Sequence, residues 1–258
     1  MKNIKSLGQN WLKNREILDN IAMLSLPDNS QIETCLEIGP GLGTLTSSLL
    51  RVYPEVIAVE FDENLAKNLP KSFPGKNLVV YNEDFLKFDL SSIKKPYVVA
   101  ANIPYYITSP IIHKLITAEN KPIRTVLLIQ KEVAERIAAL DGKQSLLSLE
   151  VQNFAKVTLG PVVGREYFTP APKVDSQVII LDPKAEPEIS PRIIEELARI
   201  GFSSPRKKLI SNLAVPKMGL SKEQLTKVFR EISLDLNVRP ADLSLKDWDN
   251  LAILLAKK

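Results

Sequence analysis

Cysteine and histidine are scarce in this sequence. Its 258 residues include one cysteine, Cys35, and one histidine, His113. A single cysteine excludes an internal disulfide and a cysteine metal cluster. Cys35 lies in an apolar run and is predicted to be a small core residue. His113 follows Ile111 and Ile112, and we interpret it as structural or surface-exposed. We therefore expect no metal site.

Long hydrophobic runs are also absent. No apolar stretch approaches the ~20 residues that a helix needs to cross a bilayer, and Met1–Lys5 lacks a signal-type apolar core. A hydrophobic content of 45% and a charged content of 25% are ordinary for a soluble globular protein. We expect a cytoplasmic monomer without a membrane partner. The net charge of +4 favours an anionic partner only weakly, so the placement of charges matters more than their sum.

What the sequence has is an alternation of strand-length apolar runs and amphipathic segments. The predicted strands are Thr34–Ile38, Val56–Glu60, Leu78–Tyr81, Tyr97–Ala101 and Thr125–Gln130. The predicted helices between and after them are Thr44–Val52, Glu63–Leu69, Ser109–Thr117 and Lys131–Leu140. Continuous apolar strands are typical of a parallel sheet covered on both faces. The alternation therefore predicts an open, doubly wound α/β domain.

The pattern changes after residue 150. Val151–Leu159 and Val174–Leu181 are predicted to add an antiparallel pair at the sheet edge, which makes seven strands. Asp182–Pro187 is predicted to be a linker. Beyond it we expect a small all-helical domain, with helices at Ser190–Phe202, Pro205–Leu213, Lys222–Phe229 and Leu245–Leu255, and with caps at Ser221 and Ser244. The domains are predicted at 1–184, with a polar arm and a helix at Arg15–Ser25, and at 185–258.

The tetrapeptide Asn102–Tyr105, Asn-Ile-Pro-Tyr, directly follows a predicted strand. Pro104 holds the chain extended, because proline fixes its own backbone and disfavours the α region for the residue before it. An amide, free carbonyls and an aromatic ring are thus presented at the carboxyl end of a strand, where ligands bind in open α/β sheets. Two acceptors and a stacking face suit an exocyclic amine such as N6 of adenine. The alternative interpretation is an ordinary turn.

A glycine-rich segment, Glu37–Thr46, lies between the first predicted strand and the first helix after it. Its spacing is Gly-x-Gly-x-Gly, formed by Gly39, Gly41 and Gly43, and glycine lets a backbone approach a ligand closely. This is neither the Gly-x-Gly-x-x-Gly dinucleotide fingerprint nor a Walker A loop. On its own such a segment is weak support for a ligand site.

Two acids end the next two strands. Glu60 can accept hydrogen bonds from both hydroxyls of a ribose, and Asp84 can accept one from the amino group of adenine. Together with the glycine turn they predict a pocket for an adenosine with a charged tail and no pyrophosphate, which describes S-adenosylmethionine. Two alternatives are a tight strand–helix turn with two exposed acids, and a nicotinamide cofactor, for which the third glycine is wrongly spaced.

These motifs together resemble those of the ribosomal RNA small-subunit adenine N6,N6-dimethyltransferases, the KsgA/RsmA type. The resemblance runs nearly end to end and includes Gly8–Leu12, Glu37–Thr46, Asn102–Tyr105, Phe168–Ser176, Phe202, Arg206–Leu209, Asn212–Leu213 and Arg239–Leu243. The related Erm methylases share the first four of these motifs. The chain departs from the family at Trp11, where Phe is usual, at Asn14, where Asp is common and either can cap a helix, and at 142–148, which lacks a Tyr-Gly pair.

The resemblance implies a fold, an activity and a set of site residues. The fold is a Rossmann-like, seven-stranded S-adenosylmethionine-dependent methyltransferase domain with a small helical RNA-binding domain. The substrate is small-subunit ribosomal RNA or the immature small subunit, where two adjacent adenines near the 3′ end each receive two methyl groups on N6. The implied cofactor-binding residues are Asn10, Leu12, Gly39, Gly41, Glu60, Asp84 and Asn102. The implied catalytic residues are Asn102, Pro104, Tyr105 and Phe168.

The chemistry expected at this site is mainly positioning. Acceptance of N6 hydrogens by the Asn102 side chain and the Ile103 carbonyl favours a pyramidal, more nucleophilic nitrogen, and positioning can contribute ~7–11 kcal/mol. No strong general base is needed, since the alkylated amine loses its proton to water. Tyr105 and Phe168 are expected to stack on a flipped-out base, at ~1–3 kcal/mol per base. For Phe168 alone, the alternative is ordinary core packing.

Arg206, Lys207 and Lys208 are predicted to lie on one helical turn, with Arg199 one or two turns earlier, and to bind RNA phosphates in a salt-dependent way. The alternative is a solvated helix face. Two other functions stay open. An Erm-like enzyme would act on large-subunit RNA, against which the basic helix with Asn212 and Leu213 argues. A non-enzymatic RNA-binding or assembly factor would keep the fold without turnover.

Overall fold

The protein is described from a computed structural model, which covers residues 10–28, 31–184 and 191–256, without the side chains of 191 and 192. The motif residues Gly8 and Gln9 and the linker residues 185–187 lie outside the described residues. The chain divides into two compact units. The first consists of Met1–Ala134 and Lys156–Pro183, and the second of Glu135–Ala155 and Lys184–Lys258.

The second unit thus includes Glu135–Ala155 as well as the helical part after residue 184. The division into a methyltransferase domain, 1–184, and an RNA-binding domain, 185–258, stays a prediction. In the described part of the chain, none of the helices combines the length and apolar character that crossing a membrane needs.

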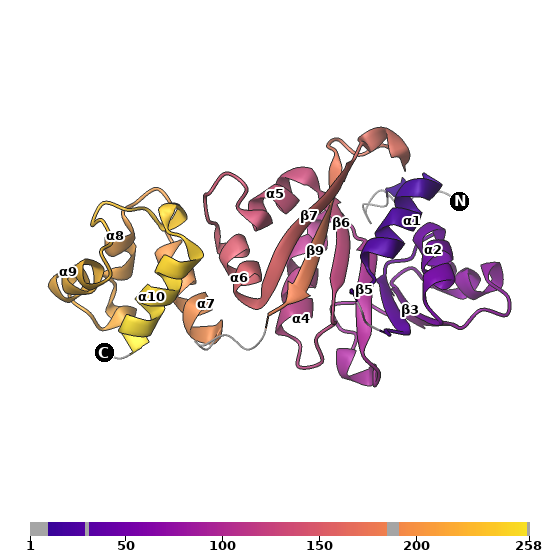
Figure 1. Ribbon diagram of the computed structural model, residues 1–258, viewed down its shortest axis with the longest axis horizontal. Helices are drawn as coiled ribbons and strands as arrows, with labels where there is room; N and C mark the ends of the chain where they lie inside the picture. The colour runs from indigo at the N-terminus through magenta and orange to yellow at the C-terminus, as the bar shows by residue number, and fades with distance from the viewer. Residues whose placement is uncertain (1–9, 29–30, 185–190, 257–258) are drawn as a thin grey trace. The chain divides into compact units, whose positions relative to one another are not determined.

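A seven-stranded sheet in the order β4-β3-β2-β5-β6-β9-β7 forms the centre of the first unit (Figure 1). Its strands are β2 (Thr34–Ile38), β3 (Glu55–Glu60), β4 (Leu78–Asn82), β5 (Tyr97–Asn102), β6 (Thr125–Gln130), β7 (Ala155–Val163) and β9 (Ser176–Pro183). β2 to β6 are parallel, and β9 runs antiparallel to β6. The five predicted parallel strands and the added strands at one edge are confirmed.

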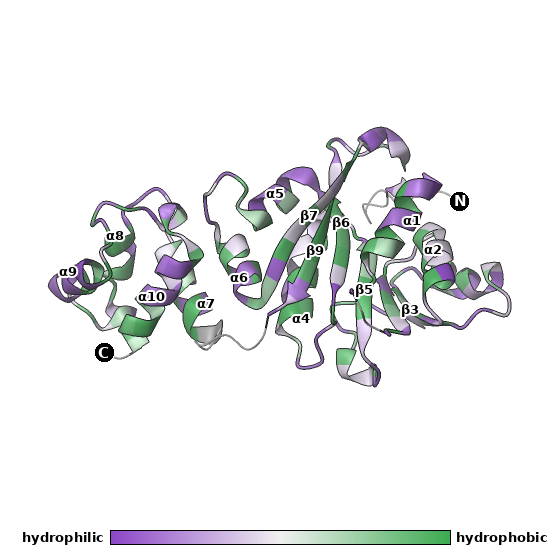
Figure 2. Cartoon of the chain, viewed as in Figure 1, coloured by the Kyte–Doolittle hydropathy of each residue, from purple (hydrophilic) through white to green (hydrophobic). Residues whose placement is uncertain are grey.

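Helices cover both faces of this sheet. On one face, α1 (Arg15–Leu24) and α2 (Thr44–Val52) pack over a core that includes Cys35, Val98 and Val126. α4 (Thr108–Thr117) lies on the other face, toward which the alternate strand residues point. Figure 2 shows β5, β6 and β9 as hydrophobic over most of their length. Burial on both faces explains why these strands appear in the sequence as continuous apolar runs.

The remaining helices of the described chain are short or belong to the second unit. They are α3 (Glu63–Asn68), α5 (Lys131–Ala138), α6 (Leu146–Phe154), α7 (Pro191–Gly201), α8 (Leu209–Leu213), α9 (Lys222–Glu231) and α10 (Leu245–Ala256). 3-10 helices occur at Leu69–Ser72, Leu90–Ser92, Tyr105–Ile107, Arg165–Tyr167, Pro216–Met218 and Pro240–Asp242. The Asn14 side chain caps α1 by accepting from the Ile17 amide at 3.1 Å.

The predicted strand Val151–Leu159 is wrong in its first four residues. Residues 151–154 end helix α6, and the strand β7 starts only at Ala155. α6 begins with a capping box, in which the Ser145 hydroxyl accepts from the Ser148 amide at 3.1 Å. Leu149 and Val151 then face the apolar core. A short buried helix and a buried strand carry the same kind of apolar run, so periodicity alone does not separate them.

Two very short strands pair across the first unit without having been predicted. β1 (Trp11–Leu12) lies antiparallel to β8 (Phe168–Thr169), with Leu12 opposite Phe168. The Lys13 amide extends the pairing by donating to the Tyr167 carbonyl at 3.2 Å. Residues more than 150 positions apart in the sequence are thereby joined. Strands of two residues have no hydrophobic pattern from which they could be recognised.

The helices of the second unit enclose their own core, in which Trp248 is fully buried and stacks on Phe202 with ring centroids 5.6 Å apart. The predicted caps are confirmed. The Ser221 hydroxyl accepts from the Gln224 amide at 3.2 Å, and the Ser244 hydroxyl accepts from the Asp247 amide at 3.2 Å.

The predicted helix Pro205–Leu213 begins later than expected, because α8 starts at Leu209. The Asn212 side chain donates to the carbonyls of Gly201 and Ser204, at 2.5 and 3.0 Å, and thereby holds the preceding residues in a turn. The prediction that Arg206–Lys208 lies on one helical turn is therefore wrong. These three residues are exposed and precede α8, with Lys208 as its N-cap residue.

Substitution of Gly43 is expected to lower the stability of the protein. Its φ is +79°, and an added Cβ would lie 2.7 Å from Leu69 Cδ1 and 3.0 Å from Phe73 Cε2. Gly43→Ala should lower the free energy of unfolding by about 2–4 kcal/mol, from backbone strain plus overpacking. Gly75 is the matched control, since its φ is +72° but nothing lies within 4 Å of the added Cβ. Gly75→Ala should cost only the strain, about 1–2 kcal/mol. Urea unfolding of both variants checks this, and equal losses would contradict the packing argument.

Candidate active site

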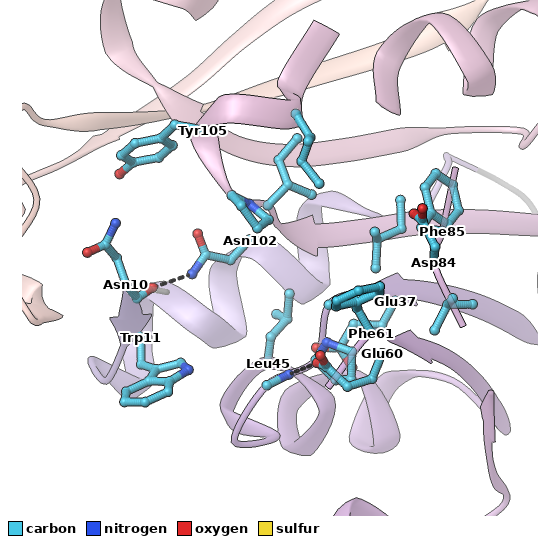
Figure 3. A pocket seen from close by; sticks show the side chains of 18 of the residues that line it. Asn10, Trp11, Glu37, Leu45, Glu60, Phe61, Asp84, Phe85, Asn102 and Tyr105 are labelled. Carbon is cyan, nitrogen blue, oxygen red and sulfur yellow. Dashed lines mark hydrogen bonds between the residues drawn. The ribbon is translucent and has the colours of Figure 1, made fainter. Parts of the chain in front are cut away.

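A cavity of about 280 Å³ opens at the carboxyl ends of β2 to β5 (Figure 3). This is the edge at which open α/β sheets bind ligands. Its lining residues come from the arm, helix α1, the glycine segment and the ends of four neighbouring strands. They are Asn10, Trp11, Leu18, Glu37, Ile38, Gly39, Pro40, Gly41, Thr44, Leu45, Val59, Glu60, Phe61, Glu83, Asp84, Phe85, Leu86, Asn102, Ile103, Pro104, Tyr105, Tyr106 and Ile107.

The glycine segment forms one wall of this cavity. Gly39 and Gly41 have φ values of +64° and +58°, which L-residues with a side chain rarely adopt. A Cβ on Gly39 would have no atom within 4 Å, so that position faces open space. A Cβ on Gly41 would lie 3.1 Å from Nε1 of Trp11. The segment therefore brings bare backbone to the cavity surface beside the indole ring.

Glu60 ends β3 and holds the backbone around it. Its carboxylate accepts from the amides of Gly41 and Asp62, each at 2.9 Å. The Asn82 side chain, at the end of β4, donates to the Glu60 carbonyl at 3.0 Å. Burial raises the pKa of Glu60, while the bonds from the two amides oppose this. The side chain is thus fixed in place, with acceptor capacity left for a ligand.

Glu37 is the most deeply buried acid on the cavity, with 1% of its surface exposed. Burial raises its pKa to about 8, although the Thr46 hydroxyl donates to it at 2.6 Å and stabilises the charged form. Burial therefore favours the protonated form of Glu37. The sequence identifies Glu37 only as the first residue of the glycine segment. Its raised pKa results from burial, which the sequence alone does not reveal.

The segment after β4 supplies the far wall. Asp84 lines the cavity, and its carboxylate accepts from the Leu86 amide at 2.9 Å. The Phe85 ring beside it is 5% exposed, whereas the Phe61 ring, after β3, is 64% exposed. Both rings line the cavity. An acidic acceptor with two aromatic rings nearby suits a flat heterocycle that carries an amino group.

Asn102 ends β5 and joins the arm to the cavity. Its Nδ2 donates to the Asn10 carbonyl at 3.0 Å. Figure 3 shows the other end of this amide, the Oδ1 atom, directed into the cavity on the side of Tyr105. A side-chain acceptor is therefore presented beside an aromatic ring.

Tyr105 is held by a residue 71 positions further along the sequence. Its hydroxyl and the Ser176 hydroxyl form a hydrogen bond of 2.7 Å, and burial raises the pKa of Tyr105. Tyr106 also lines the cavity and is 63% exposed. Its exposure excludes a core role.

The structure brings most of the predicted site residues together. Those on the cavity are Asn10, Gly39, Gly41, Glu60, Asp84, Asn102, Pro104 and Tyr105. Leu12 and Phe168 do not line it. They pair with each other in β1 and β8 and are buried in the core, at 1% and 4% exposure. Their roles as cofactor and base contacts stay predictions.

Several lining residues were not predicted as site residues. Trp11 and Phe85 each adjoin a predicted site residue, so position beside a motif was the available signal. Glu83 precedes Asp84 in the same way. Leu45, on α2, had no such signal, because its apolar spacing also fits a core residue. His113, the sequence's only histidine, is not among the described lining residues.

The cavity fits S-adenosylmethionine on several independent grounds. Glu60 offers a fixed carboxylate for ribose hydroxyls, and Asp84 offers an acceptor for an amino group. Because Gly39 has no side chain, a ligand can approach the backbone closely at this position. The apolar lining suits an enclosed ligand, as is usual for cofactor sites. Glu60, Asp84 and Gly39 would hold the group there.

The free energy of unfolding should depend on the ionisation of Glu37. Its pKa is about 8 in the folded chain against an ordinary value of 4.5, so the folded state binds the extra proton between these values. This contribution is full below the ordinary pKa and is lost as pH rises toward the folded pKa, on the order of a kcal/mol per pH unit. In Glu37→Gln the loss should be absent.

Urea unfolding of the wild type and Glu37→Gln, at about pH 6 and about pH 9, checks this expectation. The exposed Glu16→Gln is the control and should follow the wild type. If the free energy of unfolding changes with pH equally in the wild type and in Glu37→Gln, then Glu37 does not bind the extra proton in the folded chain.

Comparison with known proteins gives consistent matches. A family model described as Ribosomal RNA adenine dimethylase matches residues 1–257. Ribosomal RNA small subunit methyltransferase A of Fusobacterium nucleatum is 38% identical, covering 97% of this chain and 96% of that protein. The protein of the same name from Nostoc punctiforme is 39% identical, covering 98% of this chain and 94% of that protein.

Two solved structures are similar over nearly the whole chain. A dimethyladenosine transferase from Plasmodium falciparum has a TM-score of 0.82 at 32% identity, covering 95% of this chain and 97% of that one. The 23S ribosomal RNA methyltransferase ErmE has a TM-score of 0.79 at 25% identity, covering 96% and 100%. These likenesses agree with the seven-stranded sheet and the helices that follow it.

Proposed function

Because this chain belongs to the ribosomal RNA adenine dimethylase family, we propose that it dimethylates N6 of two adjacent adenines near the 3′ end of small-subunit ribosomal RNA. As a member of that family it is an enzyme that uses S-adenosylmethionine. The small subunit as target is supported by the names of the relatives from Fusobacterium nucleatum and Nostoc punctiforme, which align nearly end to end.

One observation carries the proposal. The Asn102 amide, the Glu60 carboxylate and the Asp84 carboxylate meet in one cavity at the ends of neighbouring strands. Glu60 and Asp84 suit the adenosine part of the donor, while Asn102 suits the amine of a second adenine. A donor and an acceptor are thus accommodated side by side, which is what group transfer requires.

The residues of the chain act mainly by positioning the target amine. The Oδ1 of Asn102 and the main-chain carbonyl of Ile103 accept its hydrogens, which directs the nitrogen lone pair out of the ring plane. Tyr105, held by Ser176, provides a face for the base. When bound, S-adenosylmethionine supplies an electrophilic methyl group, which N6 takes as the carbon–sulfur bond breaks. The proton that N6 then carries passes to water.

Contacts with RNA outside the cavity belong to the proposal as well. Arg206, Lys207 and Lys208 are exposed and consecutive, so they would present positive charge to phosphates from a turn instead of a helix face. The substrate is the small-subunit RNA or the immature subunit. The proposal includes a cytoplasmic location, because bacterial small subunits are assembled there, and a monomeric chain.

Transfer of labelled methyl groups from S-adenosylmethionine tests the proposed function. Small subunits that lack the modification should accept label, and mass spectrometry should place it as dimethyladenosine at two adjacent positions near the 3′ end. Large subunits are the parallel substrate, since ErmE acts on 23S ribosomal RNA. Label only in the large subunit would support an Erm-like function instead, and cofactor binding without any transfer would support a non-enzymatic factor.

A further inference from the structure

Lys114 projects from α4 onto the segment that follows β4. Its ammonium group donates to the main-chain carbonyls of Leu86, at 2.9 Å, and Phe88, at 2.5 Å. It also lies 5.3 Å from the centroid of the Phe85 ring, within the range of a cation–π interaction. Lys114 does not itself line the cavity among the described residues, whereas Phe85 and Leu86 do.

The segment that Lys114 contacts is a turn without a helix or strand of its own. The Asp84 carbonyl accepts from the amides of Lys87 and Phe88, at 2.8 and 3.1 Å. These bonds close the turn but do not use the carbonyls of Leu86 and Phe88. An unpaired carbonyl is costly where water is scarce, and Phe88 is buried. Lys114 therefore supplies partners for two carbonyls that the turn itself leaves unused.

Asn120, just after α4, continues the same support. Its Nδ2 donates to the carbonyls of Leu90, at 2.9 Å, and Ile93, at 2.8 Å. The polypeptide that begins with the Asn102–Tyr105 motif and continues into α4 thus holds the whole stretch after Asp84. In addition, the charges of Glu83 and Asp84 attract the Lys114 ammonium. The Lys114 ammonium therefore lies close enough to the acid that faces the cavity to interact with its charge.

We propose that Lys114 is a positioning residue that makes the site selective for adenine in the cofactor. By holding the turn, it fixes the Asp84 carboxylate and the Phe85 ring where they meet the 6-amino group and the face of the base. A base with an oxygen at that position would bring an acceptor against a carboxylate. This inference rests on the proposed function, since it takes S-adenosylmethionine as the occupant of the cavity.

Calorimetric titration with S-adenosylhomocysteine and with its inosine counterpart tests this role. The wild type should prefer the adenine ligand by at least about tenfold, because a site built to pair with an amine rejects an analogue without it. Lys114→Met should weaken the adenine ligand by about tenfold and leave the inosine ligand nearly unchanged, so that the preference is lost. The matched control is Lys94→Met, since the Lys94 ammonium also donates to a backbone carbonyl, that of Ser91 at 2.9 Å, away from the cavity. It should change neither affinity.

Asp84→Asn provides the second arm. It should abolish the preference, and adding Lys114→Met to it should alter the preference no further, because Lys114 acts through Asp84. If Lys114→Met does not fold, Lys114→Gln is measured in its place. Equal weakening of both ligands, or an unchanged preference, would overturn the inference. Failure of the wild type to bind either ligand would instead contradict the proposed function itself.

Discussion

Asn102→Ala is expected to lower the kcat for methyl transfer by about 100- to 1000-fold, the usual effect of removing one group that stabilises a transition state. In the proposed function, the Oδ1 atom of Asn102 accepts from the target amine, so alanine should leave that amine with its lone pair delocalised into the ring. The affinity for S-adenosylmethionine should change far less. The rate of methyl transfer, measured with saturating donor and small subunits, checks this expectation.

Asn102 also donates to the Asn10 carbonyl, so the loss of this tether must be separated from the loss of the acceptor. Asn102→Asp separates the two, because it keeps an oxygen toward the amine but cannot donate to the Asn10 carbonyl. The control is Asn68→Ala, which removes an exposed amide that donates to the Asn64 carbonyl outside the cavity. A kcat within about threefold of the wild type in Asn102→Ala would rule out this residue as the amine acceptor.

Glu60→Gln is expected to weaken the binding of S-adenosylhomocysteine by about 10- to 100-fold, the range expected when a charge-assisted hydrogen bond is lost. The Glu60 carboxylate accepts from the Gly41 and Asp62 amides, one on each oxygen. Glutamine has one acceptor oxygen only, and its NH2 group would face one of these amides. The substitution should therefore disturb the backbone of the glycine segment and weaken the contact with the ribose. Calorimetric titration with S-adenosylhomocysteine measures the resulting loss of affinity.

The dependence on pH provides a second measurement for Glu60. Because burial raises its pKa, the wild type should lose affinity for the ligand as pH falls through that raised value, while Glu60→Gln should not. The exposed Glu63→Gln is the control and should bind like the wild type. An affinity within about twofold of the wild type in Glu60→Gln would exclude the ribose contact.

Much of the fold could be predicted because local sequence determines it. Continuous apolar runs such as Tyr97–Ala101 are strands buried on both faces, and the structure has them so. Ser221 was recognised as a cap because its hydroxyl acts within one turn. The errors arose where the local signal was ambiguous. Residues 151–154 form the end of a buried helix whose apolar run equally fits a strand.

The candidate site was predictable to the extent that each residue belongs to a recognisable motif at the end of a strand. The carboxyl ends of parallel strands meet at one edge, so the order of motifs alone indicated that Glu60, Asp84 and Asn102 would lie together. Lys114 belongs to no recognisable motif, so the sequence did not indicate that it supports the site. Its contact with Leu86 spans 28 positions and depends on how α4 packs.

The sequence by itself determined the alternation of strands and helices and the glycine segment after the first of the parallel strands, since each depends on neighbours a few positions away. Only the tertiary structure decided that the arm pairs with β8, that Leu12 and Phe168 are buried while Tyr106 is exposed, and that burial raises the pKa of Glu37. These properties depend on which residues, distant in the sequence, pack against a side chain and exclude water from it. A local sequence pattern does not contain that information.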